Sequence, residues 1–210
     1  MICLSDNDFL KKLAVCDLLS EAMDALETNF GEVYVLNTAR HVLLKPLKNP
    51  EIAKTRLGEA VYERISQFLD RAQTLNVILA PDEQRLFEDI PAIDPGEAVL
   101  FSATAHFPSC LLATGDKSCL RALAGNSNCQ IVCQRLTNRV VCFEQVILRI
   151  IDRSGFTVVR DKVVPAYGCD TALRAVFGSG LEATEETVRA GLTSYVTDLR
   201  QHTGSLLVKS

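Results

Sequence analysis

Three short acidic segments carry the residues best suited to chemistry in this chain of 210 residues. They are Ser5-Asp6-Asn7-Asp8, Asp94-Pro95-Gly96-Glu97 and Thr114-Gly115-Asp116-Lys117. The first and third each follow an apolar run typical of a buried strand, and all three precede a segment with a helical pattern. Carboxylates that meet at one place repel one another unless a cation lies between them. Oxygen-rich sites of this kind suit Mg²⁺ or Mn²⁺.

The elements that must position these acids alternate between strand and helix. Apolar runs predict strands at residues 1–5, 32–37, 110–114 and 139–143, and an edge strand at 75–79. Helical patterns occupy residues 7–27, 38–45, 51–72, 82–89, 95–106, 117–123, 130–136 and 144–153. This alternation predicts a three-layer α/β/α fold around a mostly parallel sheet of about four to five strands. In such a sheet the strand-to-helix turns converge, so Asp6 and Asp116 are expected to lie close together.

Residues 155–210 have a different pattern from the rest of the chain. Helices are predicted at 166–177 and 184–203, and Gly178-Ser179-Gly180 joins them. No strand pattern follows. We therefore expect an α/β domain over residues 1–154 and a C-terminal helical extension over residues 155–210 that packs on it.

The composition is that of a globular protein, with 48% hydrophobic and 23% charged residues. A formal net charge of −4 argues against a general polyanion binder. No apolar run approaches the roughly 20 residues that span a bilayer, and the N-terminus lacks a signal-peptide pattern. The eight cysteines show neither CxxC pairs nor zinc-ligand spacing, which indicates buried reduced thiols. We expect a cytoplasmic protein with no membrane partner.

One stretch of the chain is locally basic. Between residues 40 and 56 a single acid, Glu51, opposes Arg40, Lys45, Lys48, Lys54 and Arg56. The stretch is either an ordinary solvated helix face or a patch that grips phosphates.

Each acidic segment also has a purely structural interpretation. Asp94 and Glu97 match a capping box with Pro95 in the first helical position. Asp6 and Asp116 match helix N-caps. Capping is the commoner role for any one of these acids, but their joint occurrence at strand ends favours a functional site.

Other site chemistries have less support. The chain contains no GxGxxG, GxxxxGK[ST] or GxSxG motif. Asp6-Asn7-Asp8 resembles the DxD motif of haloacid-dehalogenase-like phosphatases, but Leu10 stands where that family has Thr or Val. Leu120 and Arg121 also stand where that family has a further acid. This phosphatase reading is the weaker alternative.

Residues 1–150 resemble the PIN-domain family. The family begins with an apolar strand that ends in Asp, then a polar residue and Asn or Asp, as in Asp6-Asn7-Asp8. In one branch of the family a later helix begins with the motif Asp-x-Gly-Glu, which is similar to Asp94-Pro95-Gly96-Glu97 here. The next strand ends in Thr-x-Asp and a basic residue, as in Thr114-Gly115-Asp116-Lys117. The order and the spacing of the three motifs both agree.

The resemblance implies metal-dependent hydrolysis of phosphodiester bonds, most often in single-stranded RNA. It assigns Asp6, Glu97 and Asp116 as catalytic residues that hold one or two Mg²⁺ or Mn²⁺ ions. It assigns supporting roles to Asp8, which orients the site, to Thr114 and Lys117, which contact phosphate, and to Arg40 and Lys45, which guide the strand.

The chain departs from the family at one position. PIN domains usually carry a glutamate in the helix after the second strand, whereas residues 37–43 contain no acid. Glu59 or Glu63 on the next helix is a candidate substitute. The alternative is a catalytically inactive PIN-like module that binds RNA or protein. The resemblance also raises two kinds of protein partner: a second copy of the chain, and a small antitoxin if the chain is a toxin.

Overall fold

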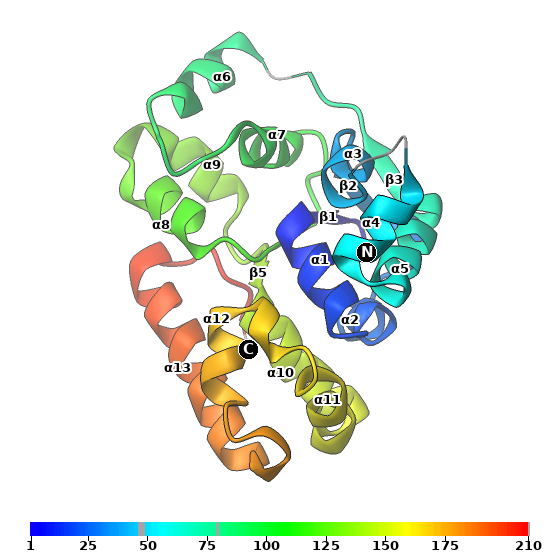
Figure 1. Ribbon diagram of the computed structural model, residues 1–210. Coiled ribbons are helices and arrows are strands. Elements are labelled where there is room, and N and C mark those ends of the chain that lie inside the picture. The colour runs from blue at the N-terminus through cyan, green and yellow to red at the C-terminus, as the bar shows by residue number, and fades with distance from the viewer. Residues whose placement is uncertain (46–48, 79, 210) are drawn as a thin grey trace.

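Five short parallel strands form one central sheet (Figure 1). They are β1 (Cys3–Ser5), β2 (Val33–Leu36), β3 (Gln73–Leu75), β4 (Leu111–Thr114) and β5 (Val140–Cys142). Their order across the sheet is β3-β2-β1-β4-β5, and Leu4 in the central strand pairs with Tyr34 on one side and Leu112 on the other. This computed structural model describes residues 1–45, 49–78 and 80–209. The α/β class and the parallel sheet agree with the sequence prediction.

Helices fill most of the rest of the described chain. The α-helices are α1 (Asn7–Val15), α2 (Leu19–Ala25), α3 (Ala39–Leu43), α4 (Pro50–Leu57), α5 (Glu59–Arg71), α6 (Pro81–Glu88), α7 (Pro95–Ala103), α8 (Lys117–Gly125), α9 (Gln130–Arg135), α10 (Phe143–Ser154), α11 (Phe156–Val163), α12 (Thr171–Val176) and α13 (Glu185–Thr203). Short 3₁₀ turns are η1 (Phe30–Glu32), η2 (Ser127–Cys129), η3 (Tyr167–Cys169) and η4 (Gly180–Glu182). None of the helices within the described ranges is long and apolar enough to cross a membrane.

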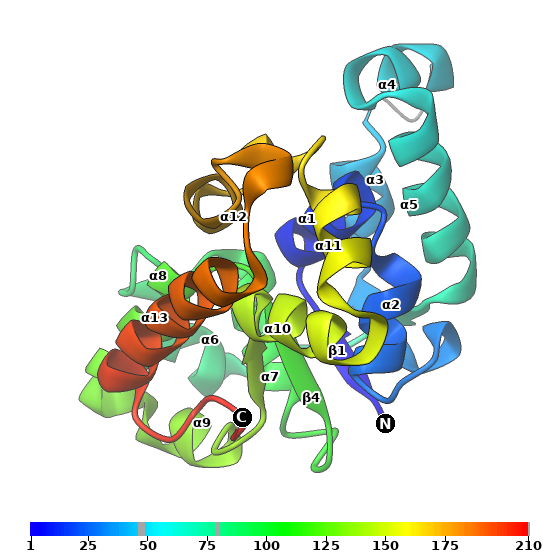
Figure 2. The same ribbon diagram turned by 90° about the horizontal axis from the view of Figure 1, so that it is seen from below.

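An apolar core lies on each side of the sheet, and the two cores are separate. In β4, Leu111 and Ala113 enter one core, and Leu112 between them enters the other. The first core packs against α1, α2, α5 and α10, and the second packs against α7, α8 and α9. Because both faces are covered, β1, β4 and β5 are buried along their whole length, whereas Gln73 and Thr74 of the edge strand β3 are exposed. The fold is therefore the three-layer α/β/α arrangement that the sequence predicts (Figures 1 and 2).

Two predicted long helices are each broken in the structure. The helix predicted over residues 7–27 is α1 followed by α2, and Asp17 between them has a φ of 55°. The helix predicted over residues 51–72 is α4 followed by α5, and Gly58 between them has a φ of 85°. Left-handed residues end helices. The apolar period continues through both breaks, so the period alone did not reveal them.

Two further elements differ from the prediction. The edge strand is β3, which shares only Leu75 with the predicted range of residues 75–79, because its pairing with β2 sets Thr74 beside Val35. Residue 79 lies outside the described residues. Helix α11 was not predicted; Gly155, with a φ of 87°, separates it from α10. The other predicted helices each overlap an observed helix.

The C-terminal segment covers the β5 edge of the sheet. Helix α13 packs against both α8 and α10, and Figure 1 shows α10 to α13 gathered at one end of the molecule. The chain then returns to β5, where the N–H of Val140 donates to the carbonyl of Leu206 at 3.0 Å. The N–H of Val208 donates to the carbonyl of Val140 at 2.8 Å. This single bridge occupies backbone groups that an edge strand otherwise leaves open.

Candidate functional site

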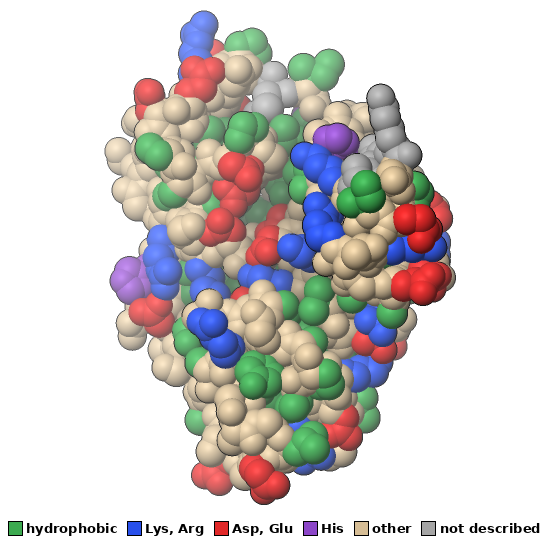
Figure 3. Space-filling model, viewed as in Figure 1, with side chains coloured by type: hydrophobic (Ala, Val, Ile, Leu, Met, Phe, Trp, Pro, Cys, Tyr) green, Lys and Arg blue, Asp and Glu red, His purple; other side chains and the backbone are tan. Residues whose placement is uncertain are grey.

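An open cleft lies at the carboxyl edge of the sheet, between α1, α4 and α7. Its volume is about 970 Å³. The lining includes the predicted acids Asp6, Asp8, Glu97 and Asp116 and the basic residues Lys11 and Arg56. Figure 3 shows acidic side chains to the left of the central hollow and basic side chains to its right. The fold therefore brings the three acidic segments of the sequence to one cleft.

Asp6 follows β1 and caps α1. The N–H of Phe9 donates to its Oδ1 at 2.5 Å, and the hydroxyl of Thr114 and the N–H of Gly115 donate to its Oδ2, the latter at 2.8 Å. The residue is 7% exposed. Burial raises the pKa of Asp6, against the effect of these hydrogen bonds. Since each carboxylate oxygen has two lone pairs and Oδ1 accepts from Phe9, Oδ1 retains acceptor capacity.

Glu97 lies in the first turn of α7, in the predicted capping box. Its Oε2 accepts from the N–H of Asp94 at 2.8 Å, and its own N–H donates to Asp94 Oδ1 at 2.8 Å. Burial, and then the negative charges of Asp116 and Asp94, raise the pKa of Glu97 to about 7. A Cβ at Gly96 would lie 2.8 Å from Leu36 Cδ1, so glycine lets this turn approach β2 closely.

Asp116 follows β4 and caps α8. Its Oδ1 accepts from the N–H of Ser118 at 2.7 Å, from the Ser118 hydroxyl at 2.5 Å and from the N–H of Cys119 at 3.1 Å. Burial alone raises the pKa of Asp116, but these hydrogen bonds and the nearby charge of Lys12 lower it overall. Asp116 is therefore ionised at neutral pH, and it lies beside Glu97, which keeps its proton to a higher pH than an ordinary glutamate.

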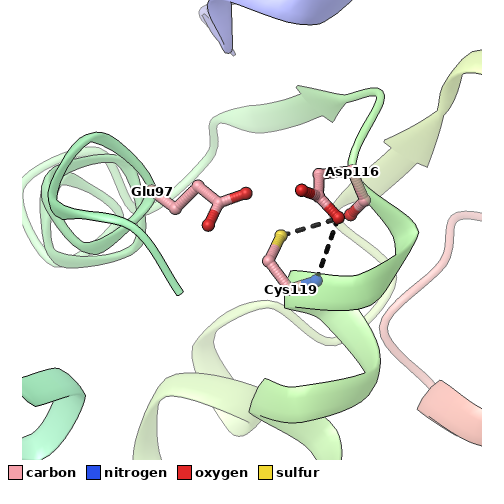
Figure 4. Close-up of side chains that lie close together, drawn as sticks. All are labelled: Glu97, Asp116 and Cys119. Atoms are coloured by element: carbon pink, nitrogen blue, oxygen red, sulfur yellow. Dashed lines mark hydrogen bonds between the residues drawn. The ribbon is translucent and has the colours of Figure 1, made fainter. Parts of the chain in front are cut away.

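Glu97 and Asp116 of the cleft lining form a group of possible metal ligands with Cys119, which is buried beside them. One ligand atom from each lies within 4.8 Å of the other two, and Figure 4 shows Glu97 reaching from α7 toward Asp116, which precedes α8, and Cys119, which lies on α8. The Cys119 thiol donates to the Asp116 carbonyl at 3.2 Å. Burial, then the charge of Glu97, raises the pKa of Cys119, so it remains a thiol. Asp6 lines the same cleft but is not one of these three residues.

This donor set fits a divalent cation. Two carboxylates suit Mg²⁺ or Mn²⁺, and the thiol adds affinity for a softer metal. Asn7 Oδ1, a further hard oxygen on the cleft lining, is buried and has no hydrogen-bond partner among the described residues. Sequence reasoning missed Cys119. The available clue is that it follows Asp116 by three residues, on the same face of the first turn of α8.

Asp8 and Thr114 bind neighbouring protein groups. Asp8 pairs with Lys12 at 2.6 Å, and its side chain is 55% exposed. Thr114 donates its hydroxyl to Asp6 and accepts the N–H of Asp116 at 3.0 Å. Thr114 therefore joins the two turns that carry Asp6 and Asp116, whereas Asp8 is paired with Lys12 within α1.

Lys117 is engaged by an acid that sequence reasoning missed. Its ammonium lies 2.5 Å from Glu144 Oε1, and Glu144 is 1% exposed. The same ammonium lies 5.8 Å from the centre of the Tyr195 ring. Glu144 is the second residue of α10, directly after the edge strand β5, so a carboxylate also follows the strand next to β4. The Lys117 charge is thus matched by a buried partner.

The basic residues that were predicted to guide RNA differ in whether they line the cleft. Arg40 is exposed and pairs with Asp70 at 2.5 Å, and neither Arg40 nor Lys45 belongs to the cleft lining. Arg56 belongs to it, together with Lys11, which sequence reasoning did not single out. Lys48 lies outside the described residues. Glu59, a candidate substitute for the missing family acid, pairs with Lys54 at 3.5 Å, and neither Glu59 nor Glu63 is part of the lining.

Comparison with known proteins adds no further assignment. No protein-family model, no curated protein and no solved structure gives a significant match to this chain. The PIN-domain resemblance therefore stays a prediction from the sequence motifs. The functional argument rests on the cleft and its charged groups.

Proposed function

We propose that the chain is a metal-dependent phosphodiesterase that cleaves single-stranded RNA, with a centre formed by Asp6, Glu97 and Asp116. The observation that carries this proposal is the pairing of Glu97 and Asp116 across an open cleft at the carboxyl edge of a parallel sheet. The pKa of Glu97 is raised to about 7, by burial first and then by nearby negative charge. A cation between the two groups relieves that repulsion.

One wall of the cleft carries the acidic residues that bind the metal ion, and the opposite wall carries the basic residues that bind RNA. Glu97 and Asp116 hold Mg²⁺ or Mn²⁺, and Asp6 contributes its Oδ1 oxygen. When bound, the ion lowers the pKa of a water molecule and offsets charge on the phosphoryl oxygens. Lys11 and Arg56 on the opposite wall bind phosphates of the RNA backbone. The acidic wall alone repels RNA, so the basic wall and the ion together account for binding.

A catalytically inactive binding module is the second candidate, and one observation favours it. The segment after β2 lines the cleft with Thr38, Val42 and Leu43. None of these residues is an acid, so the segment supplies no carboxylate where PIN domains usually carry a glutamate. A phosphatase of the haloacid-dehalogenase type has less support, because Leu10 stands where that family has Thr or Val, and Leu120 and Arg121 stand where it has a further acid. The toxin role and the cytoplasmic location stay predictions; the eight free cysteines fit a reducing compartment.

The test combines RNA cleavage with metal binding. Labelled single-stranded RNA is incubated with the full chain in Mn²⁺, with EDTA, and with the Asp116→Asn variant. Asparagine keeps the N-cap of α8, so the variant is expected to fold. Asp82→Asn is the matched control, since the Asp82 side chain is 97% exposed on α6. Calorimetry measures Mn²⁺ binding by the same proteins.

Three outcomes separate the candidates. Cleavage by the wild type and Asp82→Asn, lost with EDTA and in Asp116→Asn, supports the nuclease. Mn²⁺ binding that depends on Asp116 without cleavage of any RNA leaves a metal-binding module. Equal Mn²⁺ binding by wild type and Asp116→Asn contradicts the proposed centre.

A further inference from the structure

Outside the cleft, two thiols from opposite ends of the chain lie in contact. Cys16 Sγ is 3.7 Å from Cys169 Sγ, across 153 positions of sequence. Cys16 is the buried C-cap residue of α1, and Cys169 is the half-buried last residue of η3. In the described part of the chain no other two cysteines are hydrogen-bonded to each other. The fold therefore selects one pair out of eight cysteines.

Polar contacts of two lysines join the regions of the chain that carry the two thiols. The ammonium of Lys162 binds the carbonyl of Asp17 at 2.9 Å and the carboxylate of Glu21 at 2.6 Å. The ammonium of Lys12 binds the carboxylate of Asp170 at 2.9 Å. Asp17 directly follows one cysteine of the pair, and Asp170 directly follows the other. The contact between the sulfur atoms is thus fixed by its neighbours.

The two thiols differ in reactivity and access. A hydrogen bond from Cys16 lowers the pKa of Cys169, and the charge of Lys12 acts in the same direction. The same hydrogen bond, and then burial, raises the pKa of Cys16. Cys169 is also the more accessible residue, since it is half-buried whereas Cys16 is buried. Cys169 is therefore placed to react first.

We propose that Cys169 and Cys16 are an oxidative modification site, and that they form a reversible disulfide in response to a peroxide. The Cys169 thiolate attacks one peroxide oxygen, the O–O bond breaks, and hydroxide leaves and takes up a proton as water. Cys169 is then a sulfenic acid. The Cys16 sulfur attacks the Cys169 sulfur, the S–O bond breaks, and a second water leaves with the Cys16 proton. The two thiols lose two electrons in total, and the peroxide gains them.

The disulfide ties α1 to the C-terminal helices. The sulfur atoms must close from 3.7 Å to about 2.05 Å, a distance that side-chain rotation and small backbone shifts cover. Because the bond links positions far apart in the chain, it restricts the unfolded state strongly. We expect a rise in Tm of about 5–10 °C on oxidation.

The test treats the reduced full chain with increasing hydrogen peroxide and follows intact mass, peptide maps without reductant, and Tm. The variants are Cys169→Ser, Cys16→Ala and Cys133→Ser, because Cys133 is the other half-buried cysteine. Wild type and Cys133→Ser are expected to lose two hydrogen atoms and to yield a peptide linked between positions 16 and 169, which dithiothreitol reverses. Cys16→Ala is expected to stop at a sulfenic acid that dimedone traps at Cys169.

Other results overturn the proposal. Oxidation of Cys133 before Cys169, a disulfide between other cysteines, or equal oxidation of wild type and Cys169→Ser would each do so. If Cys16→Ala does not fold, the linked peptide of the wild type and its absence in Cys169→Ser still decide the question. No readout depends on RNA or on a metal ion, so the result is independent of the proposed nuclease activity.

Discussion

The carboxylate of Asp6 and the hydroxyl of Thr114 join the ends of two neighbouring parallel strands that are 108 residues apart in the chain. The same hydroxyl accepts the backbone N–H of Asp116 at 3.0 Å. One buried side chain therefore sets the positions of two acids in the cleft. This arrangement makes Thr114 a positioning residue for the proposed metal centre.

Replacing Thr114 with valine is expected to lower the free energy of unfolding by about 1–3 kcal/mol, because it leaves buried polar groups without a partner. The pKa of Asp6 is expected to rise further, since the hydroxyl now lowers it. Urea denaturation measures the first effect. Thr137→Val is the control, because Thr137 is exposed and should change stability by less than about 0.5 kcal/mol. An equal loss in both variants would contradict the role given to Thr114.

Glu97 is expected to make metal-free stability fall as the pH rises from about 4.5 to 7. Its pKa is raised to about 7 from 4.5, so the folded state holds the proton more tightly than the unfolded state. Stability from this group is complete below pH 4.5 and is lost as the pH passes 7. After allowance for solvent screening of a half-buried group, the loss is about 1–2 kcal/mol.

Denaturation of Glu97→Gln at several pH values checks this slope. Glutamine keeps the capping box, so the variant should lack the decline without losing the helix start. Glu186→Gln, at an exposed position in the first turn of α13, should retain the wild-type slope. Saturating Mn²⁺ should also reduce the decline of the wild-type unfolding free energy with pH, since the cation favours the ionised carboxylate. A wild-type slope in Glu97→Gln would contradict the assignment.

Cys119 is expected to control which metals the cleft prefers. Cys119→Ser should lower Zn²⁺ affinity at least about tenfold and change Mn²⁺ affinity little, because a thiolate suits the softer ion. Zn²⁺ binding by the wild type should release one proton more than binding by the variant. Calorimetry in two buffers of different ionisation enthalpy measures both quantities. Cys133→Ser should match the wild type, and equal Zn²⁺ affinity in all three proteins would exclude Cys119 as a ligand.

The basic wall of the cleft is expected to bind RNA through its phosphates. Lys11→Gln should weaken RNA binding about two- to fivefold at moderate salt. The slope of log affinity against log salt concentration should fall by about one, which corresponds to one counterion fewer released on binding. Lys45→Gln removes the same charge outside the cleft lining and should have a smaller effect. Fluorescence anisotropy at several salt concentrations separates the two. A larger effect of Lys45→Gln than of Lys11→Gln would contradict RNA binding by the basic wall of the cleft.

The sequence alone determined the local features of this protein. The strand-helix alternation predicted the parallel three-layer fold, and the capping motifs predicted where α1, α7 and α8 begin. These features depend on contacts between residues a few positions apart, so the residue order reveals them. The convergence of strand ends in a parallel sheet also allowed Asp6 and Asp116 to be predicted at one edge.

Only the tertiary structure decided which side chains meet there. It set Cys119 beside Glu97, paired Lys117 with the buried Glu144, and brought Cys16 to Cys169. It also broke two helices whose apolar period runs on without interruption. Each of these outcomes depends on how distant segments pack, because a side chain's partner and pKa are set by neighbours in space that sequence periodicity does not encode.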